Sequence, residues 1–125
     1  MIRACVIACA LAATPVLAED RKIDCDNPMI QSEMNFCAYQ AWQQADEELN
    51  ETYGWALGVS ENWSLAAQDA LRDAQRAWVP YRDAACEAEG FLFEGGSMQP
   101  LIVYSCKEHL TRQRTQEMRA VYEMH

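Results

Sequence analysis

Residues 32–57 read SEMNFCAYQAWQQADEELNETYGWAL, and the apolar side chains in this stretch recur every three or four positions. This spacing places them along one face of an α-helix and leaves amide and charged side chains on the opposite face. The apolar face consists of Met34, Cys37, Ala38, Ala41, Trp42, Ala45, Leu49, Tyr53 and Ala56. The stretch therefore predicts an amphipathic helix with Ser32 as its N-cap.

A second helix is predicted after a break at residues 58–62, with Ser64 as its N-cap. Pro80 lies inside this helix and is expected to kink it, because proline removes a backbone hydrogen bond and clashes with the carbonyl of Arg76. The side chains expected to face inward are Leu65, Leu71, Ala74, Trp78, Tyr81 and Ala85.

A third helix is predicted to open at Ser97 and Pro100, after a second break at residues 90–96. No alternating strand pattern of useful length is present. Short connections make consecutive helices antiparallel, so the expected fold is all-α, a small antiparallel three-helix bundle stapled by disulfides. The inward side chains of the third helix are expected to be Val103, Cys106, Leu110, Arg114, Met118 and Val121.

The first 18 residues have the features of a secretory signal peptide. The apolar run at residues 4–13 is too short to span a bilayer, and Val16 and Ala18 place small residues before a cleavage site after Ala18. Residues 19–125 are then expected to form a helical domain in the periplasm or outside the cell. Cys9 ends a motif like a lipid-attachment box, but too few apolar residues precede it, which disfavours a lipoprotein.

Removal of the signal peptide leaves four cysteines, Cys25, Cys37, Cys86 and Cys106. An even number in a small exported chain predicts two disulfides. Folding the chain about residue 61 or 62 sets Cys37 opposite Cys86, whereas folding it about residue 96 sets Cys86 opposite Cys106. We expect Cys37–Cys86 with Cys25–Cys106, and the alternative is Cys25–Cys37 with Cys86–Cys106. A zinc site is not expected, because the sequence has no close Cys-x-x-Cys pair.

The chain is strongly acidic, with a formal net charge of −9, and the predicted signal peptide contains an arginine but no acidic residue. Such a charge repels nucleic acid and anionic membrane surfaces and favours a cationic protein partner. No cofactor and no membrane span are predicted. Sequence motifs for a nucleophile elbow, a phosphate-binding glycine loop or a zinc-peptidase helix are absent, so no catalytic residue is predicted and a binding protein is expected.

Five polar residues are expected to meet between the first two helices when these pair in an antiparallel hairpin. Asp46 and Asn50 lie one helical turn apart, so both can face Arg76. The expected role is a hydrogen-bonded clamp that sets the helix register, and the alternative is a ligand site. The five residues are Asp46, Asn50, Arg76, Arg82 and Asp83.

The loop before the third helix is the predicted partner-binding segment. Paired glycines let a partner approach the main chain, and the flanking Phe91 and Phe93 offer apolar anchors. Turn formation and helix capping are the alternative explanation. The predicted partner-binding residues are Phe93, Glu94, Gly95, Gly96 and Ser97 in the loop, with Glu47, Glu48 and Glu51 on the first helix as acidic residues that steer a cationic partner.

Several ordered strings make the sequence resemble the LprI-like lysozyme-inhibitor domain. They occupy residues 32–37, 45–53, 74–78, 81–86 and 95–97, followed by Cys106, Thr111 and Arg114. The resemblance implies a small helical, disulfide-bonded domain of the bacterial envelope, and an inhibitor of a lysozyme-type hydrolase. It supplies no set of inhibitory residues to transfer. An envelope regulatory or structural protein that binds another periplasmic component is the alternative function.

Overall fold

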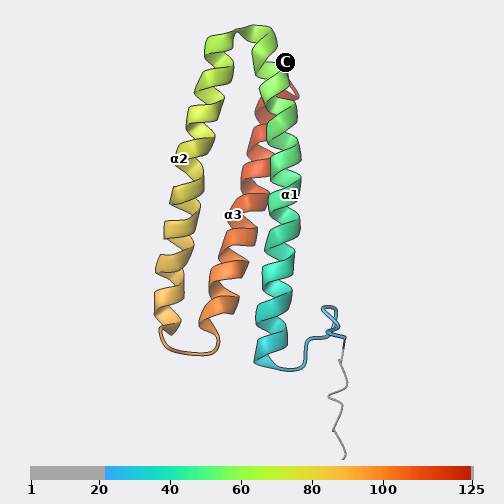
Figure 1. Cartoon of the computed structure of the whole chain (residues 1–125), viewed down its shortest axis with the longest axis vertical. Coiled ribbons are helices and arrows are strands. Elements are labelled where there is room, and N and C mark those ends of the chain that lie inside the picture. Colours follow the sequence, from blue (N-terminus) through green and yellow to red (C-terminus); the bar gives the residue numbers. More distant parts are fainter. Residues whose placement is uncertain (1–21, 125) are drawn as a thin grey trace, which may run out of the picture.

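Three long helices running up, down and up account for most of residues 22–124, which the computed structural model describes (Figure 1). The helices are α1 (Gln31–Trp63), α2 (Leu65–Gly90) and α3 (Gln99–Tyr122), and a short 3-10 helix, η1 (Phe91–Phe93), follows α2. No strand occurs among the described residues. The predicted all-α three-helix bundle is confirmed. The predicted signal peptide lies outside the described residues.

The connection between α1 and α2 is a single residue. Ser64 has extended backbone angles, and its hydroxyl accepts a hydrogen bond from the N–H of Ala67 at 3.0 Å, which confirms the predicted cap. The predicted break at residues 58–62 is wrong, because α1 continues to Trp63. Gly58 is therefore tolerated inside the helix, at the modest conformational cost of an interior glycine.

Two other predicted caps are wrong. The N-cap of α1 is Ile30 rather than Ser32, and the start of the helix is held by the Glu33 carboxylate, which accepts a hydrogen bond from the N–H of Met29 at 2.7 Å. The N-cap of α3 is Met98 rather than Ser97, and it makes no side-chain cap. A carboxylate contact takes the place of the expected hydroxyl cap at the start of α1, and main-chain hydrogen bonds to the carbonyls of Gly96 and Met98 do so at the start of α3.

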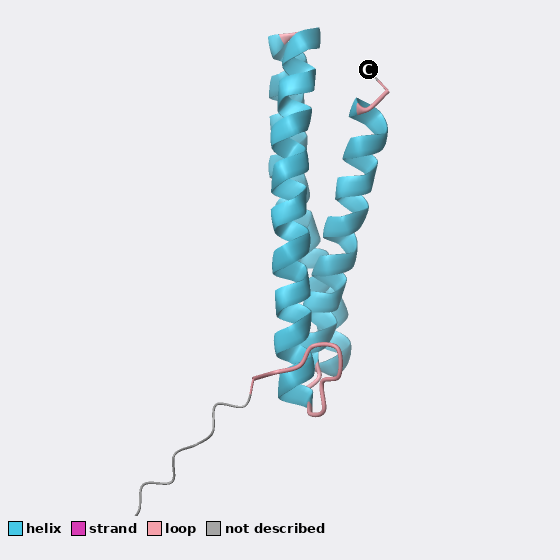
Figure 2. Ribbon diagram, turned by 90° about the vertical axis from the view of Figure 1, so that its right-hand side faces the viewer, coloured by secondary structure: helices cyan, strands magenta, loops and turns pink. Residues whose placement is uncertain are grey.

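The helices that pack most closely are α1 and α3, although they are not consecutive in the chain. Both run in the same direction, antiparallel to α2 (Figures 1 and 2). Trp42 stacks on Tyr104 near one end, and Trp63 stacks on Tyr122 at the other. Between these aromatic pairs, the core cluster of buried residues is Leu49, Ala56, Leu71 and Met118.

The buried face of α2 differs from the predicted one. Leu65 and Tyr81 are exposed, whereas Gln75 and Arg82 are buried. A pattern based on hydropathy assigns amide and guanidinium side chains to the solvent, so it misses a helix face on which two polar residues are buried and bonded.

The favoured pairing Cys37–Cys86 with Cys25–Cys106 is wrong, and the alternative is confirmed: Cys25 is bonded to Cys37, and Cys86 to Cys106. Cys86 is on the α2 face that packs on α3, so it meets Cys106 rather than a cysteine of α1. The first bridge instead ties the segment before α1 back onto α1 itself. Both bridges lie in the half of the bundle that contains the loop between α2 and α3, because Cys37 is near the start of α1, Cys86 near the end of α2 and Cys106 near the start of α3.

Gly90 allows the end of α2 to pack directly against α3. A Cβ atom at this position would lie 2.5 Å from Cγ2 of Val103, which is closer than side-chain carbons can approach. The absence of a side chain therefore places the following loop close to the start of α3.

We predict that the two bridges differ in their contribution to stability. Cys86 and Cys106 are buried and join two helices, so replacing both with alanine should lower the free energy of unfolding by about 3 kcal/mol in the chain-entropy model and further through the loss of buried sulfur packing. The Cys25→Ala, Cys37→Ala pair is the control and should lower it less, because it releases only an exposed segment. Urea unfolding followed by circular dichroism measures both, and equal losses would contradict the prediction.

Candidate functional site

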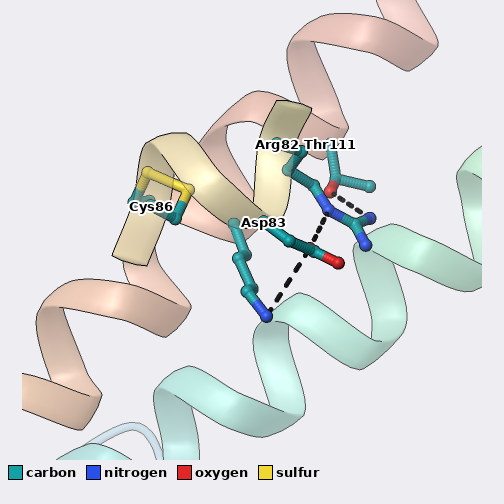
Figure 3. The surroundings of a disulfide bond; sticks show 6 residues. Arg82, Asp83, Cys86 and Thr111 are labelled. Atoms are coloured by element: carbon teal, nitrogen blue, oxygen red, sulfur yellow. Dashed lines mark hydrogen bonds and ion pairs between the residues drawn. A yellow bond between two sulfur atoms is a disulfide. The ribbon is translucent and has the colours of Figure 1, made fainter. Parts of the chain in front are cut away.

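A buried arginine connects all three helices. Arg82 on α2 is 4% exposed, and its Nη1 donates hydrogen bonds to Oδ1 of Asp46 on α1 at 2.9 Å and to Oγ1 of Thr111 on α3 at 3.3 Å. Its Nε donates to Oδ1 of the neighbouring Asp83 at 3.0 Å. Figure 3 shows Arg82, Asp83 and Thr111 beside the Cys86–Cys106 bridge.

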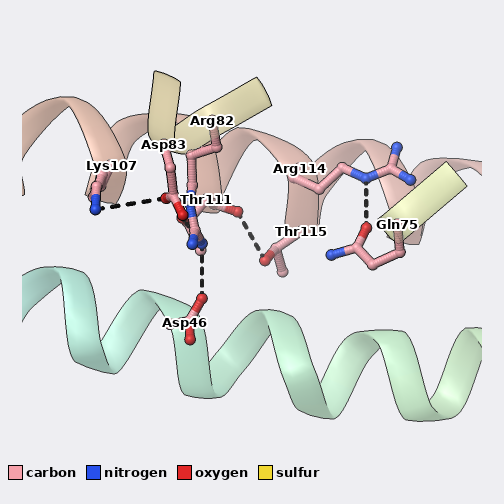
Figure 4. A network of polar contacts seen from close by, with 8 residues as sticks. All are labelled: Asp46, Gln75, Arg82, Asp83, Lys107, Thr111, Arg114 and Thr115. Atoms are coloured by element: carbon pink, nitrogen blue, oxygen red, sulfur yellow. Dashed lines mark hydrogen bonds and ion pairs between the residues drawn. The ribbon is translucent and has the colours of Figure 1, made fainter. Parts of the chain in front are cut away.

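Aromatic rings and a second cation complete the network around Arg82. The guanidinium carbon lies 5.4 Å from the ring centroid of Trp42 and 5.2 Å from that of Trp78. Lys107 forms an ion pair with Asp83 at 3.5 Å (Figure 4). Its Nζ lies 4.6 Å from the ring centroid of Trp42. Two cations therefore face two carboxylates, and cation–π contacts add to the stabilisation of both cations.

The same line of polar contacts continues along α3 toward its carboxyl end. The Thr115 hydroxyl donates to the carbonyl of Thr111 at 3.1 Å, and Nε of Arg114 donates to Oε1 of Gln75 at 3.1 Å (Figure 4). These groups satisfy one another between the helices. Because both carboxylates of the network are bonded to cations, the arrangement suits a structural clamp better than acid–base chemistry.

The structure brings together three of the five predicted clamp residues: Asp46, Arg82 and Asp83. Arg76 lies outside the network, with its side chain 78% exposed and an ion pair to Asp73 at 3.9 Å. Asn50 is also exposed. Both lie on the outer sides of their helices, so the expected contact of Asp46 and Asn50 with Arg76 is not formed.

The two α3 members of the network, Lys107 and Thr111, were not predicted. Lys107 follows Cys106 directly, and Thr111 lies one helical turn further along the chain, so both are on the helix face next to the disulfide. This spacing is the sequence feature that could have indicated their contact with α2. The predicted clamp contains polar contacts only between α1 and α2, so these two residues of α3 are missing from it.

The end of the bundle that contains the α2–α3 loop has a concentration of exposed large apolar side chains. We call this end the tip: residues 91–98 together with residues 29 and 30, which precede α1. Leu92 is 82% exposed. The exposed apolar residues of the tip are Met29, Ile30, Phe91, Leu92, Phe93 and Met98.

The loop of the tip has a defined conformation. Gly95 has a φ of 76°, which favours glycine, and the N–H of Gly96 donates to the carbonyl of Phe93 at 2.9 Å. The amide of Asn35 on α1 donates to the carbonyl of Ser97 at 2.9 Å and so ties the loop to another helix. The predicted loop residues, including Glu94, are all exposed here. The predicted set omitted Leu92, Met98, Met29 and Ile30, since apolar residues are ordinarily expected in a core.

The three predicted acidic residues of α1 lie away from the tip. They are exposed, and Glu47 lies 16 residues beyond the start of α1, which corresponds to roughly 24 Å along the helix axis. Glu48 is not free, because Arg112 donates to it at 3.2 Å. Arg112 also donates to Glu108, and this hydrogen bond raises the pKa of the Arg112 guanidinium above its usual range.

The described part of the chain contains no cluster of histidine, cysteine and acidic side chains that could hold a metal ion. Within residues 22–124, every helix is too short or too polar to cross a bilayer.

Comparisons with known proteins identify one family. The family model described as "Lysozyme inhibitor LprI" matches residues 25–118. An uncharacterized protein of Rhizobium meliloti (strain 1021) is 40% identical over 119 residues, which covers 87% of this chain and 86% of that protein. No solved structure matches the chain.

We predict that Asp46→Asn lowers the free energy of unfolding by about 2 kcal/mol, because it removes a charged acceptor from the buried Arg82. Arg76→Gln is the matched control and should change it by less than about 0.5 kcal/mol, because its ion pair with Asp73 is exposed. Chemical denaturation of both variants checks this. A change within about 0.5 kcal/mol for Asp46→Asn would exclude a clamp role for this pair.

Proposed function

We propose that this chain, which belongs to the lysozyme inhibitor LprI family, is a secreted or periplasmic binding protein. In this proposal it inhibits lysozyme-type cell-wall hydrolases. The amino-terminal sequence pattern and the two disulfides support export, since disulfides persist in oxidising compartments. The protein acts by binding rather than by catalysis in this proposal, which agrees with the inhibitor description of the family.

The observation that carries the proposal is the tip. Its apolar side chains are exposed to solvent, yet the loop that presents them is tied to α1 through Asn35 and Ser97. The Cys86–Cys106 bridge joins the two helices that flank the loop. A surface that is already ordered loses less conformational entropy on binding, so such a loop suits insertion into the cleft of a hydrolase.

The charge of the chain supports a cationic partner. The formal net charge is −9, and many lysozymes are strongly cationic. Opposite charges accelerate the encounter of two proteins, whereas contacts in the bound state determine how slowly they separate. In this proposal the acidic surface speeds association, and the apolar tip supplies the short-range contacts.

We predict that Phe91→Ala and Leu92→Ala each weaken inhibition by about tenfold, because exposed apolar anchors contribute mainly at the centre of an interface. Leu65→Ala is the control: Leu65 is 69% exposed but lies at the opposite end of the bundle. Clearing of a bacterial cell-wall suspension by purified lysozyme measures the inhibition. Failure of the well-folded wild-type protein to inhibit or bind lysozyme would instead favour a regulatory or structural partner in the envelope.

We further predict that the association rate falls by about tenfold between roughly 20 mM and 500 mM salt, because screening shortens the range of the attraction, while dissociation changes much less. Glu47→Gln combined with Glu51→Gln should also slow association. Glu48 is left unchanged in this variant because it is bonded to Arg112. Surface plasmon resonance at several salt concentrations measures both rates, and a salt-independent association rate would exclude charge steering.

A further inference from the structure

A cavity of about 340 Å³ lies between α1 and α3, in the half of the bundle opposite the tip. It is lined by Glu51, Thr52, Trp55, Arg119 and Glu123. Figure 2 shows α3 diverging from the other helices toward its carboxyl end, which is the region of this cavity. Its volume falls within the range of roughly 300–1,000 Å³ that is common for small-molecule sites.

The charged side chains of the cavity do not neutralise one another. Glu51, Arg119 and Glu123 form no ion pair within 4.0 Å with any residue in the described part of the chain, although all three border the same space. The cavity therefore contains charged donors and acceptors whose hydrogen-bonding capacity is unused by the protein.

The hydroxyl of Thr52 provides a second, independent observation. Thr52 is 3% exposed, and its Oγ1 is buried without a hydrogen-bond partner. A buried polar atom without a partner carries a free-energy cost, so buried hydroxyls are ordinarily paired. Thr52 lines the cavity, so a change of its χ1 rotamer that turned this hydroxyl toward a bound ligand would remove that cost.

Trp55 adds an aromatic surface to the polar groups. Its side chain is 42% exposed and follows Glu51 by one helical turn. A large exposed indole beside unpaired polar groups offers stacking and hydrogen bonding in one place, which is the combination that a ligand with both an apolar face and polar edges requires.

We propose that this cavity binds one pyranose ring of a neutral glycan. The C–H face of the ring would lie on the Trp55 indole, and each sugar hydroxyl could donate to Glu51 or Glu123 and accept from Arg119. A cationic ligand would satisfy the carboxylates but would be repelled by Arg119, and an anionic ligand would meet the reverse problem. A zwitterion could also pair with both kinds of charge, but a neutral polyhydroxylated ring adds a C–H face that covers the exposed indole of Trp55.

This inference does not depend on inhibition of lysozyme, because the cavity and the tip lie in opposite halves of the bundle. The two sites can therefore fail separately. Loss of tip function leaves glycan binding intact, and loss of glycan binding through Trp55→Ala leaves inhibition intact.

The indole N–H signals of the ¹⁵N-labelled exported protein test the proposal. Four tryptophans are present, and each signal is assigned by a tryptophan-to-phenylalanine variant. Tri-N-acetylchitotriose and maltotriose are the probes, each titrated to about 10 mM, which saturates a site with a Kd near 1 mM. We expect at least one of them to shift the Trp55 signal saturably, with the Trp42 and Trp78 signals unchanged.

Variants then test which side chains hold the sugar. Trp55→Ala and Glu51→Gln should each reduce the affinity by about fivefold or more, whereas Glu61→Gln, an exposed acid elsewhere on α1, should leave it unchanged. Circular dichroism confirms folding of each variant. The proposal is overturned if neither sugar shifts the Trp55 signal or if Trp55→Ala binds the sugar as the wild type does. A shift caused by arginine amide or acetate, with both sugars without effect, would overturn it in favour of a charged ligand.

Discussion

The guanidinium of Arg82 is the charge on which the arrangement of the three helices depends. It comes from α2, is bonded to Asp46 on α1 and to Thr111 on α3, and lies against two indole rings. Removing a cation from water without partners costs several kcal/mol, so packings that leave it unpaired are strongly disfavoured. Only a register that supplies these partners from both neighbouring helices buries this side chain at a tolerable free energy.

The clamp and the tip are linked through the end of α2. Cys86 follows Arg82 by one helical turn, and Cys106 directly precedes Lys107. The bridge between α2 and α3 is therefore adjacent to the polar network. Gly90 then brings α2 against Val103 of α3 just before the chain turns into the loop. The exposed apolar residues of the tip are thus presented from a cross-linked, closely packed base, which explains how a short loop can stay ordered without being buried.

The three helices and the cap at Ser64 could be predicted because they depend on local patterns: apolar spacing and the preference of serine for helix starts. The disulfide pairing and the clamp could not be fully predicted. Hairpin reasoning offers Cys86 a partner on either neighbouring helix, Cys37 of α1 or Cys106 of α3, and the apolar pattern of α2 does not show which of its faces meets α3. Arg82 was placed near Asp46 by that reasoning, but Thr111 and Lys107 were not. The exposure of Leu92 could not be predicted either, because an apolar residue in a sequence ordinarily indicates burial.

The pairing of the cysteines divides the covalent structure into two blocks. One bridge lies within the segment that ends in α1, the other within the hairpin of α2 and α3, and neither crosses Ser64. A protease that cut the chain at this one-residue corner would therefore leave two fragments held together by side-chain packing and hydrogen bonds alone. Such a nicked protein would behave as a heterodimer, and its folded fraction would fall on dilution although both of its disulfides stayed intact.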